Sequence, residues 1–509
     1  MRTGAGLLAA GLALAAVPAP ALAGPCDALR GVRVADVTLD ALTEVGPDRP
    51  FTPPLPGAAP MTQRFCRVEG RIEHEIGFEL WLPERAAWNR RLLTGGVGGQ
   101  AGSFNFRELV RAVARGYAGA STDAGHKTSD TTWLLNRPDR AANYAWRANH
   151  LLAVKAKALL RAAYGTPPRH AFFIGCSGGG RQALTAVQRF PGDYDGVIAG
   201  APGVNTPAMS ARRLWEMQRH SEWGAAVPAA VWRIARDGAV RQCDAQDGVR
   251  DGVVDDPRAC RVDPSSLLCR PGQQGECLTA SQAEAVRRLY APLHDETGKR
   301  IDGGLLPTAL VSPAPLPEPF TPGPSYLATV LFAQGVHRDL GWDPRTFSLA
   351  RDLPAIDRVM NLHADDPRID RFVASGGKLI LYQGWDDPLV AAQTTLDYFG
   401  ALQARFGAAL PRSVRLFMVP GMDHCRGGPG ADLLGGAGGD APLADPQHDL
   451  LSALEAWVDG GKAPETVIAS KLESGALVRT RLLCAWPARS VWSGQGETAS
   501  AASYLCRKG

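Results

Sequence analysis

The sequence predicts an α/β fold whose chemistry lies in loops that follow the carboxyl ends of strands. Residues 171–182 read Ala-Phe-Phe-Ile-Gly-Cys-Ser-Gly-Gly-Gly-Arg-Gln, an apolar strand that turns through a glycine-flanked serine into a helical pattern. Further apolar strands follow at 196–202, 378–382 and 414–419, and the last two end in loops that carry aspartates and a histidine. The long gap between 202 and 378 indicates an insertion. Together these observations predict an α/β-hydrolase core with a large inserted lid domain.

The turn after the first of these strands has the pattern Gly-x-Ser-x-Gly, in which Gly175 and Gly179 frame Ser177. In α/β-hydrolases this strained turn lifts a serine hydroxyl out of the sheet, and a Cβ at either glycine would strike a neighbouring strand or helix. Glycine-rich turns before helices also occur without chemistry. The apolar strand before the turn and the helical pattern at 181–190 favour the catalytic interpretation, so Ser177 is the predicted nucleophile.

A serine nucleophile needs a base, which in this fold comes last along the chain, after the acid. Of the ten histidines, only His424 and His448 lie beyond the strand at 378–382. His448 opens an amphipathic stretch and is most simply a surface helix residue. His424 follows the strand at 414–419, at a carboxyl end where α/β folds bind their ligands. His424 is therefore the predicted base.

The acid is expected on the loop after the strand at 378–382, which reads Gln383-Gly-Trp-Asp-Asp-Pro-Leu-Val390. Asp386 and Asp387 are both candidates. We expect one of them to cap the turn and the other to reach the imidazole of His424. Spacing alone does not separate them.

Two cysteines adjoin the predicted catalytic residues: Cys176 precedes Ser177, and Cys425 follows His424. If the serine and the histidine touch, these cysteines come within bridging distance, which predicts a disulfide between the two loops. The alternative is a pair of unrelated buried thiols. The chain has ten cysteines and no Cys-x-x-Cys pair, which favours five disulfides over a metal cluster. Local spacing suggests the other four pairs as Cys26–Cys66, Cys243–Cys260, Cys269–Cys277 and Cys484–Cys506.

The spacing of the catalytic residues locates the insertion. Ser177 lies 210 positions before Asp387, whereas Asp387 lies 37 positions before His424. A plain core needs far fewer residues between nucleophile and acid. We therefore expect the core at 24–205 and 369–509, and a lid domain at 206–368 that closes over the acyl part of an ester. Its aromatic residues Trp342 and Phe347 belong either to the core of the lid or to a substrate pocket.

These motifs resemble those of the tannase and feruloyl esterase family, which also contains the esterase that cleaves mono(hydroxyethyl) terephthalate. The resemblance rests on Cys176-Ser177, on His424-Cys425 and on the pattern Gly-Trp-x-Asp-Pro, and it runs from the segment at 88–96 to the last cysteines. The resemblance implies that Asp387 is the acid and that Asp386 occupies the variable position. It also supports each of the disulfide pairings.

An esterase needs donors aimed at the oxyanion that forms when the serine attacks. The backbone N–H of Gly178 is one, and the glycine-rich loop at 92–102 should supply the other. No Gly-Lys-Ser/Thr follows this loop, which excludes a phosphate-binding P-loop. The resemblance implies Gly98 as the second donor, with Gly99 as the fallback. It also covers the segment at 122–126, whose His126 either lines the acyl pocket or has a structural role.

The predicted lid contains an acidic segment at 243–256, in which Asp244, Asp247 and Asp251 recur between glycines. Such oxygen ligands suit Ca²⁺, with the carbonyl oxygens of Val249 and Val253 completing the shell. The spacing is not that of an EF-hand, and the alternative is a solvated acidic hairpin. The segment is similar to the calcium loop of the family at all five positions, which implies a structural Ca²⁺ ion. No redox cofactor is expected.

The amino terminus and the charge bear on the destination and the partners. Met1-Arg-Thr precedes an apolar stretch at 6–17 and an Ala-x-Ala site at 21–23, which predicts a signal peptide at 1–23. The apolar run is too short to span a membrane, and Cys26 stands too far beyond the cleavage site for a lipid anchor. The net charge of +4 with no basic block excludes a nucleic-acid partner. We expect a secreted or periplasmic protein; its oligomeric state stays open.

The sequence thus predicts a secreted serine carboxylesterase that acts on small-molecule esters of aromatic acids. Ser177 attacks, His424 transfers the proton, and Asp387 orients the imidazole. Hydrolysis of a terephthalate monoester or of a tannin depside is the alternative within this class. An alternative of another class is a non-catalytic, calcium-stabilised binding protein on a hydrolase scaffold, against which the complete triad argues. A peptidase is disfavoured because nothing resembles a site for a free peptide terminus.

Overall fold

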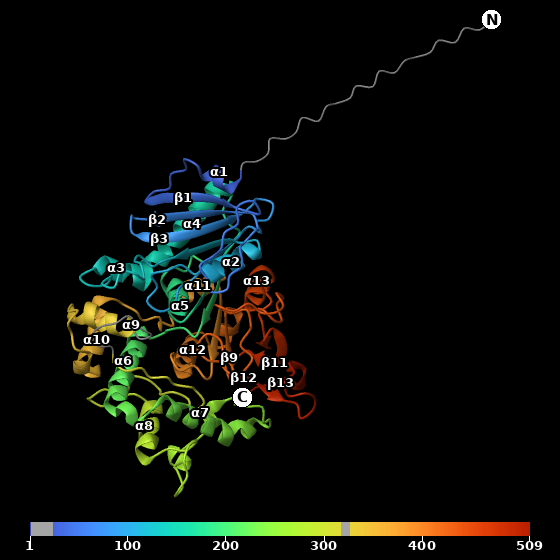
Figure 1. Ribbon diagram of the computed structural model, residues 1–509. Coiled ribbons are helices and arrows are strands. Elements are labelled where there is room, and N and C mark those ends of the chain that lie inside the picture. The colour runs from blue at the N-terminus through green and yellow to red at the C-terminus, as the bar shows by residue number, and fades with distance from the viewer. Residues whose placement is uncertain (2–23, 317–325, 509) are drawn as a thin grey trace.

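The computed structural model describes Met1 and residues 24–316 and 326–508. The predicted signal peptide therefore lies, apart from Met1, outside the described residues. Within them, nine strands form one mixed sheet in the order β1-β2-β3-β5-β4-β6-β7-β8-β9 (Figure 1). Their bounds are Val37–Val45 (β1), Phe65–Ile72 (β2), Ile76–Pro83 (β3), Arg91–Gly95 (β4), Ala118–Thr122 (β5), His170–Cys176 (β6), Gly196–Gly200 (β7), Lys378–Gly384 (β8) and Val414–Val419 (β9).

The sheet is antiparallel at one end and parallel over the rest. β1, β2, β3 and β5 pair antiparallel in succession, and every neighbouring pair from β5 to β9 is parallel. The parallel strands are nearly continuous apolar runs, as expected where both faces of a sheet are covered. Because β6, β8 and β9 are parallel, the loops that follow them meet at one edge of the sheet. This is the predicted α/β arrangement.

Helices cover both faces of the sheet. Successive side chains of a strand point to opposite faces, so Phe173 of β6 joins the core beneath α4, α5 and α12, whereas Phe172 and Ile174 join the core beneath α13. His448 does not start a helix, since α13 begins at Leu450. The helices of the core are α1 (Pro25–Leu29), α2 (Phe106–Ala114), α3 (Pro138–Ala142), α4 (Ala148–Tyr164), α5 (Gly178–Arg189), α12 (Ala392–Phe406) and α13 (Leu450–Gly460).

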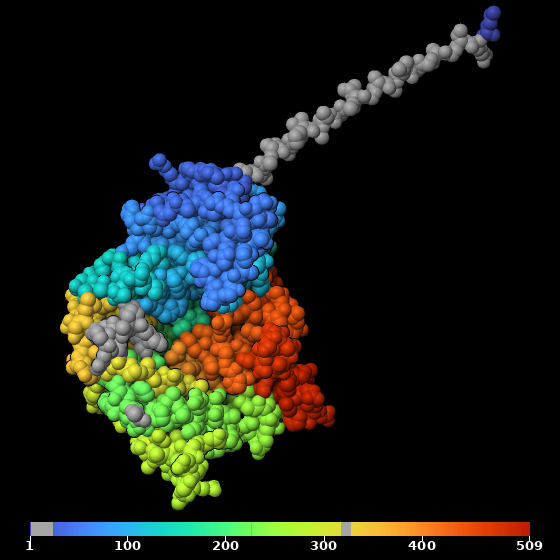
Figure 2. Space-filling model, in the orientation of Figure 1, coloured from blue at the N-terminus to red at the C-terminus, as the bar shows by residue number. Residues whose placement is uncertain are grey.

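The chain between β7 and β8 is helical in its described part and adds no strand to the sheet. It has a core of its own, in which Trp232, Leu278 and Leu289 are buried. Figure 2 shows this green and yellow segment as a layer beside the orange and red carboxyl-terminal part. The boundaries 206–368 of a lid domain stay a prediction. The helices are α6 (Thr206–Trp223), α7 (Ala229–Cys243), α8 (Ala280–Tyr290), α9 (Tyr326–Val330), α10 (Leu349–Val359) and α11 (Asp370–Ala374).

The carboxyl-terminal residues form two small sheets that the sequence did not indicate. β10 (Thr466–Glu473) pairs with β11 (Ala476–Cys484), and β12 (Ala488–Trp492) pairs with β13 (Tyr504–Lys508). Residues 369–509, expected to be core throughout, therefore also contain this pair of hairpin-like sheets outside the main sheet.

All ten cysteines lie in the described part of the chain and form disulfides, and the five predicted pairs are confirmed. Four of the five close loops of at most 40 residues, while Cys176–Cys425 spans 249. Among the helices of residues 24–316 and 326–508, none combines the length and apolarity needed to cross a bilayer.

Candidate active site

Ser177 stands at the turn from β6 into α5, as predicted. Its φ of 60° and ψ of −121° are a conformation that a residue with a Cβ rarely adopts, and such strain is typical of a nucleophile turn. A Cβ at Gly175 would lie 2.4 Å from the carbonyl oxygen of Gly179, and one at Gly179 would lie 3.0 Å from the backbone of Gly96. The two glycines therefore permit the close packing that this turn requires.

Asp387 is the acid that reaches the base. Its Oδ2 lies 2.8 Å from Nδ1 of His424, and its side chain is fully buried. The other oxygen, Oδ1, accepts hydrogen bonds from the backbone N–H groups of Leu389 and Val390, at 2.8 and 2.9 Å. Asp387 thus caps the turn and orients the imidazole with the same carboxylate. The expectation that two aspartates divide these tasks is wrong.

Asp386 makes a different contact. Its Oδ1 accepts a hydrogen bond of 2.5 Å from the hydroxyl of Thr308, which belongs to the predicted lid. Burial raises the pKa of Asp386 to about 7, opposed by the Thr308 hydrogen bond and assisted by the charge of Asp423. Asp386 therefore joins the acid loop to the segment between β7 and β8.

His424, the predicted base, lies on the loop after β9. Burial lowers its pKa, but the charge of Asp387, the hydrogen bond from Nδ1 and the charge of Asp423 together raise the pKa above its ordinary value. Because Nδ1 faces Asp387, Nε2 is the ring nitrogen left for proton exchange. His448 plays no part in this site: its Nδ1 lies 2.9 Å from Asp445.

The disulfide Cys176–Cys425 joins the nucleophile turn to the base loop, with 6.0 Å between the Cα atoms. Its two cysteines are the immediate neighbours of Ser177 and His424, so the bond limits how far the serine and the imidazole can separate. Two segments 249 residues apart in the sequence are thus joined beside Ser177 and His424.

The backbone of the glycine-rich loop lies beside the nucleophile turn. A Cβ at Gly98 would be 3.9 Å from the Cβ of Ser177, and one at Gly178 would be 3.2 Å from the backbone nitrogen of Gly99. The loop is held by Gln182, whose Oε1 accepts a hydrogen bond of 3.0 Å from the N–H of Val97. The contacts suit an oxyanion hole, but the donors Gly98 and Gly178, with Gly99 as fallback, stay predictions.

Comparison with known proteins identifies the family to which the chain belongs. A model of the family described as tannase and feruloyl esterase matches residues 60–507. The chain belongs to that family. It is 35% identical to an uncharacterized esterase of Xanthomonas campestris pv. campestris, covering 94% of this chain and 91% of that protein. It is 32% identical to a probable feruloyl esterase B-1 of Aspergillus terreus, covering 88% and 87%. The crystal structure of an esterase from Aspergillus oryzae superposes with a TM-score of 0.86 at 26% identity, over 95% of this chain and 99% of that one.

His126, left open between pocket and structure, is a buried packing residue in this member of the family. Its ring stacks on Trp133 at 3.9 Å and lies edge-on to Tyr144, whose hydroxyl donates a 2.8 Å hydrogen bond to the carbonyl of Gly99. Burial lowers the pKa of His126 to about 4, so the ring is neutral at pH 7. The cluster of His126, Trp133 and Tyr144 thus packs against the glycine-rich loop and contacts it through the hydrogen bond from Tyr144 to Gly99.

The two aromatic residues of the predicted lid also pack internally. Trp342 stacks on His337 at 4.6 Å, and Phe347 lies 4.6 Å from Phe332. Both side chains are buried. The structure therefore places Trp342 and Phe347 in the apolar core of the molecule.

The acidic segment at 243–256 is a turn whose carboxylates are engaged. Asp247 accepts from the N–H groups of Val249 and Asp255, while Asp251 forms ion pairs with Arg479 and Arg481 of β11, at 3.1 and 2.8 Å. These carboxylates are paired within the protein, and the choice between a calcium loop and a solvated acidic segment stays open. No group of three or more His, Cys, Asp or Glu in the described residues is gathered closely enough to hold a metal ion. The predicted calcium ligands are therefore not gathered as they stand, and calcium stays a prediction.

The sequence analysis did not single out Asp255, a further acid of this segment. Asp255 forms ion pairs with Arg481, at 2.9 Å, and burial raises its pKa to about 7 although the charge of Arg481 lowers it. The signal that could have found it is the alternation of acids through 244–256 together with the basic residues of the strand at 476–484.

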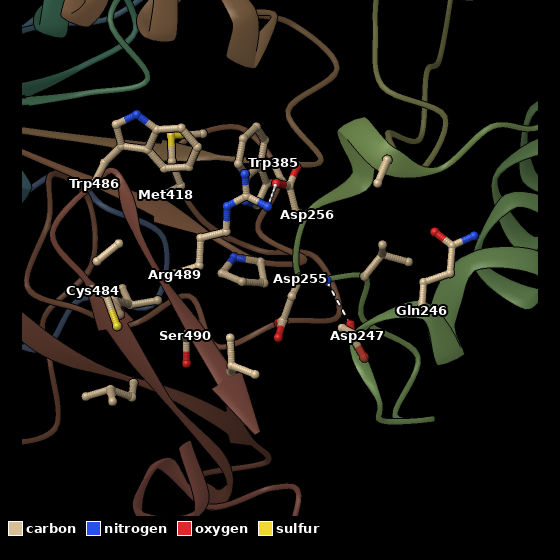
Figure 3. Close-up of a pocket in the computed structure, with 17 residues that line it drawn as sticks. Gln246, Asp247, Asp255, Asp256, Trp385, Met418, Cys484, Trp486, Arg489 and Ser490 are labelled. Atoms are coloured by element: carbon tan, nitrogen blue, oxygen red, sulfur yellow. Dashed lines mark hydrogen bonds and ion pairs between the residues drawn. The ribbon is translucent and has the colours of Figure 1, made fainter. Parts of the chain in front are cut away.

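A cavity of about 320 Å³ lies between this segment, the acid loop and the last two small sheets. Trp385 and Trp486 meet in it edge to face, and Figure 3 shows Arg489 reaching across to Asp256, with which it forms an ion pair of 2.9 Å. Trp385 directly precedes the two aspartates of the acid loop. The cavity is thus behind the acid loop, and Ser177 does not line it.

Proposed function

We propose that this protein is a secreted serine carboxylesterase that hydrolyses esters of aromatic acids. The observation that carries the proposal is the pair Asp387–His424, tied by Cys176–Cys425 to the strained turn that presents Ser177. A strained serine, an oriented imidazole and a buried acid in this chain order are the requirements of acyl transfer.

In this mechanism the hydroxyl of Ser177 attacks the ester carbonyl while Nε2 of His424 takes its proton. The developing oxyanion is stabilised by the N–H groups of Gly98 and Gly178. The imidazolium then donates its proton to the departing alcohol, which leaves an acyl-enzyme on Ser177. Water, deprotonated by His424, attacks the acyl-enzyme and releases the acid, which restores the serine. Asp387 stays ionised and holds the imidazole in place throughout.

The acyl group of the substrate is proposed from the family. The relative from Aspergillus terreus is named a probable feruloyl esterase, which supports an aromatic acid on the acyl side. Hydrolysis of a terephthalate monoester is the second candidate because the sequence motifs of the site suit both.

Five disulfides support an oxidising destination, and sequencing of the amino terminus of the mature protein tests cleavage after Ala23.

We expect a fluorophosphonate probe to label Ser177 and to abolish hydrolysis of methyl ferulate. The control is Ser177→Ala, which should take up no label. The values of kcat/KM for methyl ferulate, methyl gallate and mono(hydroxyethyl) terephthalate, measured side by side, decide between the two candidate substrates. An unlabelled wild-type protein that still binds these esters would instead favour the non-catalytic binding protein.

We further propose that the segment at 244–253 binds a structural Ca²⁺ ion through Asp244, Asp247 and Asp251 and the carbonyls of Val249 and Val253. Its oxygen donors are those that Ca²⁺ prefers. Asp244, Asp247 and Asp251 each accept a backbone N–H of this same segment, which holds their oxygens on one short loop. The ion would hold the predicted lid and take no part in the chemistry.

Removal of calcium should therefore lower the melting temperature. An ion that binds only the folded state stabilises it by about 2.7 kcal/mol at a concentration 100 times its Kd. Asp247→Ala should have the same effect as a chelator and should make the protein insensitive to it. Asp343→Ala, at a half-exposed position elsewhere in the predicted lid, should leave the sensitivity to chelator unchanged. Protein purified without chelator that contains no calcium by metal analysis and melts identically with chelator would refute the proposal.

A further inference from the structure

A buried glutamine contacts the acid of the proposed triad. Gln383 is the penultimate residue of β8, and its side chain is completely buried. Its Nε2 lies 3.1 Å from Oδ2 of Asp387, the same oxygen that faces His424. Its Oε1 accepts a hydrogen bond of 2.8 Å from the hydroxyl of Thr395, which is buried on α12. A helix of the core is thus linked through one amide to the acid.

Three acceptors determine which way the amide of Gln383 faces, and Thr395 holds its oxygen end. The Thr395 hydroxyl donates to Oε1, so the NH₂ group must point to the other side, where Nε2 lies 3.2 Å from the carbonyl oxygen of Val390 and 3.1 Å from that of Gly384. A flipped amide would set Oε1 against two carbonyl oxygens and the Asp387 carboxylate, which are all acceptors. These acceptors therefore keep an N–H donor on Asp387, and the Thr395 hydroxyl, which can donate or accept, satisfies Oε1 by donating to it.

We propose that Gln383, held at its oxygen end by Thr395, is a positioning residue that fixes the carboxylate of Asp387 for its contact with His424. With this contact each oxygen of the carboxylate faces two donors. Oδ1 accepts from the Leu389 and Val390 amides, and Oδ2 faces Gln383 and His424. Rotation of the carboxylate would break several of these bonds at once. The inference rests on the proposed function of the triad.

The contact also shares the charge of Oδ2 between two donors. Without the amide, the ionised Asp387 would attract the proton of His424 more strongly, and the pKa of His424 would rise further. The other charged group that faces His424 is Asp423, which in turn faces Arg236, Lys471, Asp387 and Asp432. Of these groups only Asp387 contacts Gln383, so a shift in the pKa of His424 in the variant reports on the contact between Gln383 and Asp387.

The test is Gln383→Met, which keeps the length of the side chain and removes the amide. We expect kcat for methyl ferulate to fall about tenfold with KM nearly unchanged, because a hydrogen bond to a charged group is lost at the acid. The acid limb of the kcat/KM profile should move to higher pH, since His424 must be neutral to act. Thr395→Val should lower kcat less, and Thr395→Ser should recover most of that loss.

A double-mutant cycle separates positioning from general stability. If Thr395 acts through Gln383, Thr395→Val should have no further effect on kcat in the Gln383→Met background. The matched control is Gln218→Met: this buried glutamine donates to the carbonyls of Pro344, Arg345 and Phe347, away from the triad. It should lower the melting temperature and leave the pH limb in place.

Two results would overturn the inference: an unchanged pH limb in Gln383→Met, or an equal loss of kcat from Thr395→Val in both backgrounds. Failure of the proposed function is distinguishable, because the wild-type protein would then hydrolyse none of the three esters. The pKa of His424 can be measured by NMR without turnover. An upward shift in Gln383→Met would therefore support the positioning role even in that case.

Discussion

Asp387→Asn should lower kcat by about 10⁴-fold while the protein stays folded. The asparagine oxygen would still accept the N–H groups of Leu389 and Val390, so its NH₂ group would take the place of Oδ2. There it would meet the N–H of His424, and the imidazole would have to turn Nδ1 into an acceptor. The proton would then sit on Nε2, the nitrogen that must take a proton from Ser177. The tautomer would be wrong for catalysis although the contacts of residue 387 with Leu389, Val390 and His424 remain.

Asp386→Asn is the matched control one residue earlier. Its carboxyl is buried, has a raised pKa and accepts from the Thr308 hydroxyl, which the oxygen of an asparagine can also do. We expect a loss of only a few fold in kcat. Steady-state kinetics on methyl ferulate, with circular dichroism to confirm folding, compare the two variants. The opposite ranking would mean that the acid is Asp386.

Loss of the disulfide between Cys176 and Cys425, in the double variant with both changed to alanine, should cut kcat about 10²-fold. The bonded residues adjoin Ser177 and His424, so their separation frees the two loops whose contact needs alignment to within roughly 0.5 Å. Closure of a loop of 249 residues also stabilises the fold by about 5 kcal/mol at most in the chain-entropy account. We expect the loss of rate to persist at temperatures well below the melting transition.

The control for this experiment is the double variant that removes Cys26–Cys66. These cysteines are buried even more deeply than Cys176 and Cys425, but Cys66 is on β2, four places from β6 in the sheet. Their loss should lower the melting temperature with little effect on kcat. Peptide mapping without reductant tests the premise, and a free thiol at Cys176 or Cys425 in active protein would contradict it. Equal losses of kcat in both double variants would contradict the positional role.

Much of the site could be predicted from the sequence because its signals are local. The turn around Ser177 needs glycines at fixed positions, and these glycines are readable without any tertiary information. Neighbours in the chain must remain neighbours in space, so Cys176 and Cys425 could be paired as soon as Ser177 and His424 were. The five disulfides and the α/β fold followed from the same local patterns.

Contacts across the fold could not be predicted in this way. The two aspartates of the acid loop look alike in sequence, and the residues alone could not separate Asp386 from Asp387; the family pattern was needed. Which of them faces the imidazole depends on how the turn after β8 packs against the loop after β9 and against Thr308. The contact from Gln383 to Asp387 joins residues four apart, but the other end of the amide is held by a hydroxyl from α12.

Ser177 and His424 could be predicted as nucleophile and base from the sequence alone, and so could the disulfide pairs and the α/β core that the structure confirms, because each prediction depends on residues adjacent in the chain or on the order of the strands. Two features can be seen only in the folded structure: Asp387 both caps its turn and orients His424, and Asp251 is paired with arginines of β11. The reason is physical: the partner of a buried polar group is chosen by packing, since the group must find a donor or acceptor among whichever segments the fold brings beside it.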